Sequence, residues 1–405
     1  MSSVLNDPAS NDIGLTKAVS SGGALRGLLA GEQLRALTLI GILLVIWAVF
    51  QLLTGGLFLT PRNLTTLAVQ VSVTAILAAG IVMVMVQGHI DLSIGSAVAF
   101  TGMVATLLVD PARGLGLTTS PTVVILITVL TGMLIGLWQG TWIAWLGVPS
   151  FIVTLASLLS LRGAALTITG GSTTSHQGIL SFVASAYVPA TYAVVILAVL
   201  IAVFAALRMA DWNARVKSSG RALPFSTSVV LPTVIGGLLA SAAAVIAFSY
   251  KGAPLPVVIL LLVASAITFV MSRTAFGRRL YAIGGNPAAA NYAGIDIKRH
   301  CLLVFVAMGA LYGIAGLILV SRIGVAVPTA GTGLELTVIA AAVIGGTSLF
   351  GGKGTAVGAV VGALLLESLN NGMGLMNVES SFQLIVNGLV LLVAVYFDIR
   401  SRRAR

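Results

Sequence analysis

The sequence predicts an all-α membrane protein, a polytopic bundle of about 10–12 transmembrane segments, some of them broken or re-entrant. Of its 405 residues 58% are hydrophobic and only 8% are charged, with a mean hydropathy of +1.08. A soluble domain normally carries about a quarter charged residues, so this composition suits lipid as the solvent. The 46 glycines agree, because glycine allows membrane helices to approach closely.

The apolar runs fall into two groups by length. Runs long enough to cross the hydrocarbon lie at 36–54, 64–87, 122–146, 185–207, 228–248, 255–272, 301–320 and 381–397. Shorter or glycine-broken runs lie at 92–109, 149–169, 335–350 and 354–372. The shorter runs predict broken or re-entrant helices, and pairing the crossings puts both termini on one side of the membrane.

The distribution of Lys and Arg orients the bundle. Seventeen lie in the N-terminal tail, the loops 208–227 and 273–300, the turn after 350 and the C-terminal tail, against four (Arg62, Arg113, Lys251 and Arg322) on the opposite side. Basic residues favour the cytoplasmic side. We therefore expect a polar cytoplasmic tail at 1–34, one transmembrane domain at 35–398 with cytoplasmic loops 208–227 and 273–300, and a basic cytoplasmic tail at 399–405.

Charge and cysteine content exclude several classes of function. The net charge of +11 does not indicate nucleic-acid binding, because the basic residues flank apolar runs and do not cluster with aromatic residues. The single Cys301 excludes an intrachain disulfide and a multi-cysteine metal site. The run 346–354 is similar to a phosphate-binding loop, but its lysine comes one residue late and Gly354 replaces the Ser or Thr that binds magnesium. We expect no cofactor on this chain.

The loop 281–295 predicts a short helix outside the membrane. Asn286 is a candidate N-cap, Pro287 a first-turn proline, and Gly294 a stop after a helix at 288–293. Ala289, Tyr292 and Ala293 share one face, which either lies on lipid or docks into a protein cleft. Its small, alanine-rich surface favours docking. The candidate docking residues are Gly285, Asn286, Pro287, Ala289, Tyr292 and Gly294.

This loop resembles the cytoplasmic coupling loop of the ribose/xylose/arabinose/galactose permease family of bacterial ABC importers. Three further blocks resemble the same family in the same order: 88–96 (GHIDLSIGS), 148–156 (VPSFIVTLA) followed by Arg162 and Gly163, and 335–372. The additional segment 208–254 makes the chain look closer to the xylose permeases than to the shorter ribose ones. His89 departs from the pattern, since many members have glycine there.

The resemblance implies the partners and the location. A second permease copy would pair with this one in the bacterial inner membrane. An ATPase subunit would bind ATP and magnesium on the cytoplasmic side, and a periplasmic sugar-binding protein would deliver a monosaccharide. D-xylose is the expected sugar, with ribose, arabinose and galactose as alternatives. A transporter driven by an ion gradient is the rival class, although the few scattered ionisable residues favour it poorly.

Polar residues within apolar runs are the candidates for a sugar path: Asp91, Ser93, Gln139, Arg162, Asn370 and Asn371. Asp91 either caps a helix beginning at Leu92 or lines the path within a broken helix. Arg162 needs a carboxylate, from Glu367 or Asp91, or backbone carbonyls. For the neutral amides, hydrogen bonding between helices is the alternative to sugar contact.

Two stripes of glycine at every fourth residue predict close packing between helices: Gly132, Gly136 and Gly140, and Gly354, Gly358 and Gly362. Trp138, Trp142 and Trp145 share a helix face near the cytoplasmic end of their span. An interfacial aromatic belt is the favoured role for them, with stacking on a sugar as the alternative.

Overall fold

The computed structural model describes residues 31–110, 120–175, 179–219 and 251–403, with a few isolated positions between 225 and 234. The described residues form fourteen helices and two small two-stranded sheets, which confirms the predicted fold class. The N-terminal residues 1–30 and most of the predicted span 228–248 lie outside the described residues.

Six helices are long and apolar enough to cross a membrane: α3 (Pro61–Val86), α5 (Pro121–Ala144), α6 (Ser150–Thr169), α10 (Leu255–Arg273), α13 (Ile297–Ile323) and α15 (Ala356–Leu375). Five more contain shorter apolar stretches: α2 (Gly31–Leu53), α4 (Ile94–Val109), α8 (Ala190–Ser219), α14 (Leu334–Ile344) and α16 (Ser380–Arg403). The remaining helices are α7 (Ile179–Ser185), α11 (Ala275–Gly285) and α12 (Pro287–Tyr292).

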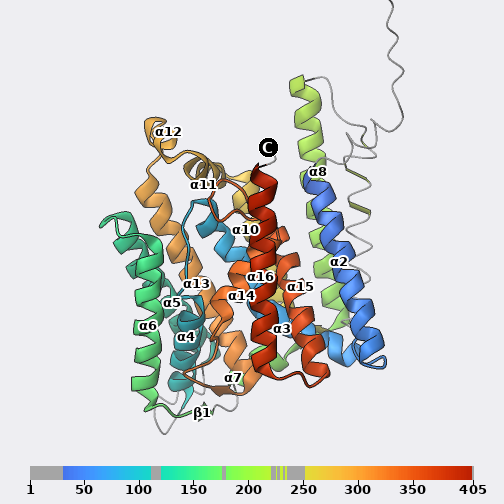
Figure 1. The fold of residues 1–405 in the computed structure, drawn as a ribbon, viewed down its shortest axis with the longest axis vertical. Coiled ribbons are helices and arrows are strands. Elements are labelled where there is room, and N and C mark those ends of the chain that lie inside the picture. Colours follow the sequence, from blue (N-terminus) through green and yellow to red (C-terminus); the bar gives the residue numbers. More distant parts are fainter. Residues whose placement is uncertain are drawn as a thin grey trace, which may run out of the picture.

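Helices α3 and α13 form the centre of the bundle (Figure 1). Helix α3 is buried along almost its whole length, and Phe305 and Tyr312 of α13 are fully buried. By contrast, α2, α5, α6, α8 and α16 expose many large apolar side chains, among them Leu44, Leu134, Leu159, Val195 and Leu392. Exposed faces of this kind are expected where helices contact lipid or another membrane subunit.

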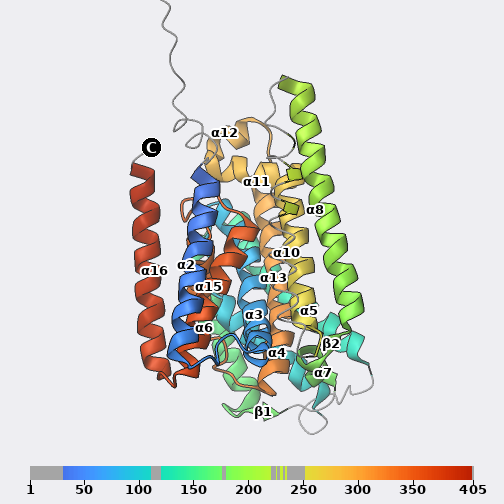
Figure 2. The ribbon, with the colours of Figure 1, turned by 90° about the vertical axis from the view of Figure 1, so that its right-hand side faces the viewer.

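The two ends of the bundle differ. One end, which we call the α12 end, holds α11, α12, the start of α2 and the end of α16 (Figures 1 and 2). The opposite end, the β1 end, holds the paired strands β1 (Thr174–Ser175) and β4 (Val325–Ala326), together with α7. The strands β2 (Tyr187–Val188) and β3 (Ala253–Pro254) form the second pair.

Helix α8 is longer than predicted. It continues to Ser219 and projects beyond the bundle at the α12 end (Figure 2). Residues 208–219 of the predicted loop 208–227 are therefore helical.

The first glycine stripe packs α5 closely against α13. A Cβ added at Gly132 would lie 2.1 Å from the carbonyl oxygen of Gly309, and one at Gly136 would lie 2.1 Å from that of Phe305. Gly140 is less tightly packed, because its added Cβ would first meet the Leu302 side chain, at 2.9 Å. The backbones of the two helices are thus too close for any side chain at Gly132 and Gly136.

The second glycine stripe is only partly helical. Gly358 and Gly362 of α15 pack against the backbone of Gly345 and Ala341. Gly354, however, lies before the helix, which begins at Ala356 with Thr355 as its N-cap. The prediction that Gly354 belongs to the same helical face was therefore wrong, because the Thr355 hydroxyl accepts the Gly358 amide and sets the start of the helix after Gly354.

Candidate functional site

The first break in the bundle is the segment 87–93 between α3 and α4. After a turn at 87–88 it carries the backbone in a non-helical conformation from the α12 end into the bundle (Figure 1). The Ser150 hydroxyl accepts the Ile90 amide at 3.2 Å, and the Thr154 hydroxyl donates to the Ile90 carbonyl at 3.3 Å. Two sequence blocks, 88–96 and 148–156, therefore form one structural unit in which α6 satisfies the backbone of the break.

Asp91 lies in a fully buried polar cluster. Its carboxylate accepts the Ser93 amide at 2.8 Å, the Ser93 hydroxyl at 2.6 Å and the Tyr312 hydroxyl. Gln139 of α5 donates to the Ser93 hydroxyl at 2.8 Å. All four side chains have 0% exposure.

This cluster bears on the two alternatives for Asp91, which were capping a helix and lining the path. Helix α4 begins at Ile94, not at Leu92, and Ser93 occupies the N-cap position without making a capping bond. Asp91 itself binds the free Ser93 amide, which is a capping role next to the helix start. The structure thus brings the three path candidates Asp91, Ser93 and Gln139 together in the buried core.

A second break meets the first inside the bundle. After β4, residues 327–333 lead into α14, which has only 11 residues. A Cβ added at Gly95, in the first turn of α4, would lie 2.1 Å from the Gly331 carbonyl oxygen and 2.3 Å from Oε2 of Glu335. The N-terminal ends of two short helices therefore touch.

Glu335 is poorly satisfied at this meeting point. Its Oε1 accepts the Gly333 amide at 3.2 Å, whereas its buried Oε2 has no hydrogen-bond partner within the described part of the chain. An unsatisfied buried carboxylate oxygen is costly. The arrangement is therefore poised to accept a hydrogen bond from another donor.

Arg162, in the middle of α6, connects the first turn of α4 to the second break. Its Nε donates to the Ser96 hydroxyl at 3.3 Å, and its Nη1 donates to the Pro328 carbonyl at 3.1 Å and the Thr332 hydroxyl at 2.8 Å. These partners are neutral oxygens: of the two alternatives, the structure contains the backbone carbonyl, together with two hydroxyls, and not a carboxylate from Glu367 or Asp91. The side chain remains partly exposed, and its partner Thr332 is exposed.

Glu367 lies elsewhere, between α15 and α3. It accepts hydrogen bonds from Gln70 at 2.8 Å and from Thr74 at 2.5 Å. These two donors on α3 satisfy a carboxylate that would otherwise be costly inside the bundle.

The remaining amides join helices. Asn371 and Asn63 exchange two hydrogen bonds, and Asn387 donates to Asn370 at 2.9 Å. The two path candidates Asn370 and Asn371 thus form hydrogen bonds between helices, which is the alternative to sugar contact.

The predicted short helix is present as α12. Asn286 is its N-cap, with Oδ1 accepting the Ala289 amide at 3.0 Å, and Pro287 is in its first turn. Gly294 follows with a φ of +77°. Tyr292 is 92% exposed and Ala289 is exposed, so the predicted face is free at the surface of the structure.

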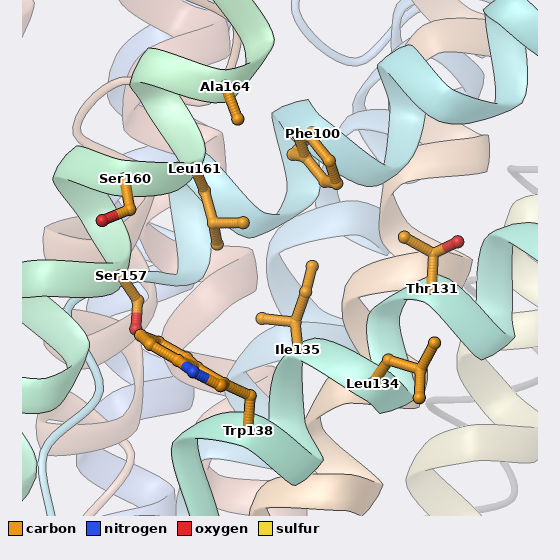
Figure 3. A pocket seen from close by; sticks show the side chains of 9 residues that line it. All are labelled: Phe100, Thr131, Leu134, Ile135, Trp138, Ser157, Ser160, Leu161 and Ala164. Carbon is orange, nitrogen blue, oxygen red and sulfur yellow. The ribbon is translucent and has the colours of Figure 1, made fainter. Parts of the chain in front are cut away.

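A cavity of about 440 Å³ lies between α4, α5 and α6 (Figure 3). Its lining is mostly apolar: Phe100, Thr131, Leu134, Ile135, Trp138, Ser157, Ser160, Leu161 and Ala164. The hydroxyls of Thr131 and Ser157 donate to carbonyls of their own helices, at 2.8 and 2.7 Å. The cavity therefore suits an apolar occupant better than a sugar.

The tryptophans of α5 lie on the outside of the bundle. Trp138 and Trp142 pack edge to face with ring centroids 6.3 Å apart. Trp138, Trp142 and Trp145 are 46%, 41% and 51% exposed, and α5 ends near the α12 end. Their exposure is compatible with the predicted interfacial belt.

Several residues of the site escaped prediction from the sequence. Tyr312 is an aromatic residue within an apolar run, and only its hydroxyl signals that a polar partner must lie in the core. Ser96, Thr332 and Asn63 carry no signal of their own, because their partners are distant in the sequence. His89 lies with Nε2 3.5 Å from the Cys301 sulfur and packs near Phe305.

Comparisons with known proteins agree with one another on membrane transport. Residues 63–395 match the family described as "Branched-chain amino acid transport system / permease component". The chain is 40% identical to the xylose transport system permease protein XylH of Escherichia coli (strain K12) over 397 residues, which cover 97% of this chain and 99% of that protein. It is 37% identical to XylH of Haemophilus influenzae over 89% of this chain and 94% of that one. It is 35% identical to the ribose import permease protein RbsC of Escherichia coli (strain K12), over 88% of this chain and 91% of that one. No solved structure matches.

Proposed function

Because the chain belongs to the family of branched-chain amino acid transport system permease components, we propose that it is the permease subunit of an ATP-driven importer of a monosaccharide, with D-xylose as the first candidate. The 40% identity to XylH, over 97% of this chain and 99% of that protein, supports D-xylose as the candidate sugar. The resemblance read from four sequence blocks, and the permease role that it implied, are thereby confirmed.

One structural observation carries the transport role: two short helices, α4 and α14, meet with their N-terminal ends inside the bundle. Gly95 and Gly331 are in backbone contact there, and Glu335 lies beside them. Discontinuous helices that expose their ends at mid-depth form the binding sites of many membrane transporters. We place the sugar path at this meeting point.

The side chains at the meeting point suit an uncharged sugar. The Arg162 guanidinium, the Thr332 hydroxyl and the buried Glu335 Oε2 offer donors and acceptors to hydroxyl groups. Asp91 is fully buried and accepts the Ser93 amide, which stabilises the start of α4. Of the residues that the sequence suggested for the path, Arg162 faces it in this proposal. Asp91, Ser93 and Gln139 are buried and stabilise the helices that surround it.

We expect a second copy of the chain to cover the surface around Arg162 and Thr332. Arg162 is partly exposed and its partner Thr332 is exposed near the middle of the bundle, where contact of a guanidinium with lipid is costly even though it is hydrogen-bonded. A second permease subunit that closes a hydrated path against α6 and α14 keeps this charge out of lipid. This homodimer is part of the proposal.

Helix α12 is the proposed docking site for the ATPase subunit, which binds ATP and magnesium. Its free face carries Ala289 and the 92% exposed Tyr292, which match a protein cleft. The α12 end is then cytoplasmic, with both termini, and the β1 end faces a periplasmic sugar-binding protein in the bacterial inner membrane. The seventeen-to-four distribution of basic residues supports this orientation.

The function is tested by uptake of labelled D-xylose into vesicles that contain this chain, its ATPase subunit and its binding protein. We expect uptake that requires both ATP and the binding protein, and that unlabelled D-xylose suppresses more strongly than ribose, arabinose or galactose. Preferential suppression by one of the other sugars would reassign the substrate but keep the class. Uptake that a protonophore abolishes while ATP is supplied would refute the ATP-driven mechanism in favour of ion coupling.

A further inference from the structure

Helix α11 touches the C-terminal end of α3, where the first break begins. A Cβ added at Gly284 would lie only 1.6 Å from the Val86 carbonyl oxygen and 2.7 Å from the Gly352 nitrogen. Val86 is the last residue of α3, directly before the segment 87–93. Gly284 is therefore packed, without room for any side chain, against the base of the first break.

The same carbonyl ties in the loop 345–355, which joins α14 to α15. The Gly352 amide donates to the Val86 carbonyl at 2.8 Å. The Tyr281 hydroxyl of α11 donates to the Gly354 carbonyl of this loop at 2.7 Å. Within the loop, the Ser348 amide donates to the Lys353 carbonyl at 2.9 Å, so the loop is held as one piece.

Helix α11 is joined stiffly to α12. Asn286 lies between them and serves both: its amide donates to the Ala282 carbonyl at the end of α11, at 3.1 Å, and its side chain caps α12. A displacement of α12 is therefore transmitted to α11 with no flexible linker in between.

From these contacts we infer that Tyr281 and Gly284 are positioning residues through which α12 moves both broken segments together. They hold the segment 87–93 and the loop 345–355 at the α12 end, while Gly95 and Gly331 join α4 to the approach to α14 inside the bundle. This inference rests on the proposed function, since it assigns a route from the docking helix to the sugar path. In this inference the run 346–354, which is similar to a phosphate-binding loop, transmits the movement of α12 and does not bind phosphate.

The experiment compares Tyr281→Phe with the unchanged chain in the full complex, and measures sugar molecules taken up per ATP hydrolysed. The substitution removes one hydroxyl and keeps the ring. We expect that ratio to fall by roughly twofold to thirtyfold, with binding of the ATPase subunit unchanged, because α12 is intact. Tyr192→Phe is the matched control, since Tyr192 is 65% exposed on α8.

A ratio for Tyr281→Phe equal to that of Tyr192→Phe would overturn the inference while leaving the importer function in place. Failure of the unchanged complex to take up sugar with ATP would overturn the proposed function instead. Backbone hydrogen exchange in the unchanged complex gives a second readout that needs no variant. Addition of a non-hydrolysable ATP analogue should alter exchange at 86–93 and 348–354 together with 281–292, and a change confined to 287–292 would contradict the relay.

Discussion

Asn63 of α3 and Asn371 of α15 exchange two hydrogen bonds, at 2.9 and 3.1 Å, so each amide is both donor and acceptor to the other. Because the two amides bond each other across the interface, this pair fixes the register of the two helices. Replacement of either residue by alanine should lower the free energy of unfolding by about 0.6–1.7 kcal/mol. Thermal unfolding in detergent micelles measures this loss.

The double variant Asn63→Ala/Asn371→Ala tests whether the two residues act as a unit. We expect its loss of stability to be smaller than the two single losses added together, since either single variant already breaks the pair. Strictly additive losses would show that the two amides contribute independently.

Close packing of α5 on α13 should make Gly132 intolerant of alanine. The added Cβ would lie 2.1 Å from the Gly309 carbonyl oxygen, so the helices must separate at a cost of about 1–3 kcal/mol. The yield of folded protein and its unfolding temperature report this cost. Gly374→Ala on α15 is the control, because nothing lies within 4 Å of its added Cβ. Equal tolerance at both positions would contradict the packing.

Asp91→Ala tests whether Asp91 stabilises the helices around the path or contacts the sugar directly. The change leaves the Ser93 and Tyr312 hydroxyls without their buried acceptor, at a cost of about 1–3 kcal/mol for each unsatisfied group. We expect a lower unfolding temperature and less protein in the membrane, with an unchanged KM for sugar in the protein that remains. A raised KM at full stability would place Asp91 in direct contact with the sugar.

Arg162→Lys should impair transport more than folding. A lysine ammonium cannot reproduce the guanidinium fork that reaches Ser96, Pro328 and Thr332 together. Loss of one charge-assisted hydrogen bond predicts a decrease in uptake of about tenfold or more. Arg62→Lys, at an exposed position, is the matched control for charge-preserving replacement. Normal uptake by Arg162→Lys would remove Arg162 from the path.

Ala289→Glu should disconnect ATP hydrolysis from uptake. A large acidic side chain on the exposed face of α12 obstructs docking into a cleft, so less sugar should enter per ATP. Ala289→Ser preserves the small face and should transport normally. If the glutamate variant matched the serine variant in sugar uptake per ATP, α12 would have no role in docking.

The structure shows which features the sequence could specify. Helix α12 was predicted from Asn286, Pro287 and Gly294 because caps and stops act on neighbouring residues. The contact of α5 with α13 was predicted only in part. Gly132 predicts a closely packed neighbouring helix, but only the fold identifies the neighbour as Gly309 of α13. Local signals thus sufficed for elements and for the presence of contacts.

The contacts between the two breaks could not be predicted, for a physical reason. Arg162 is satisfied by Ser96, Pro328 and Thr332, which are ordinary residues until the chain brings them together. Its need for partners was evident from its place in an apolar run, yet the sequence alone could not decide between a carboxylate, from Glu367 or Asp91, and backbone carbonyls. Glu367 instead accepts hydrogen bonds from Gln70 and Thr74, so both of these ionisable side chains are hydrogen-bonded by neutral groups.

The burial of Cys301 has a practical consequence. As the only cysteine of the chain, 2% exposed and packed beside His89, it is shielded from thiol-reactive dyes in the folded protein. A Tyr292→Cys chain should therefore carry one accessible thiol, placed on α12. A fluorophore attached there would report the approach of a partner subunit from a single known position, with no need to remove native cysteines first.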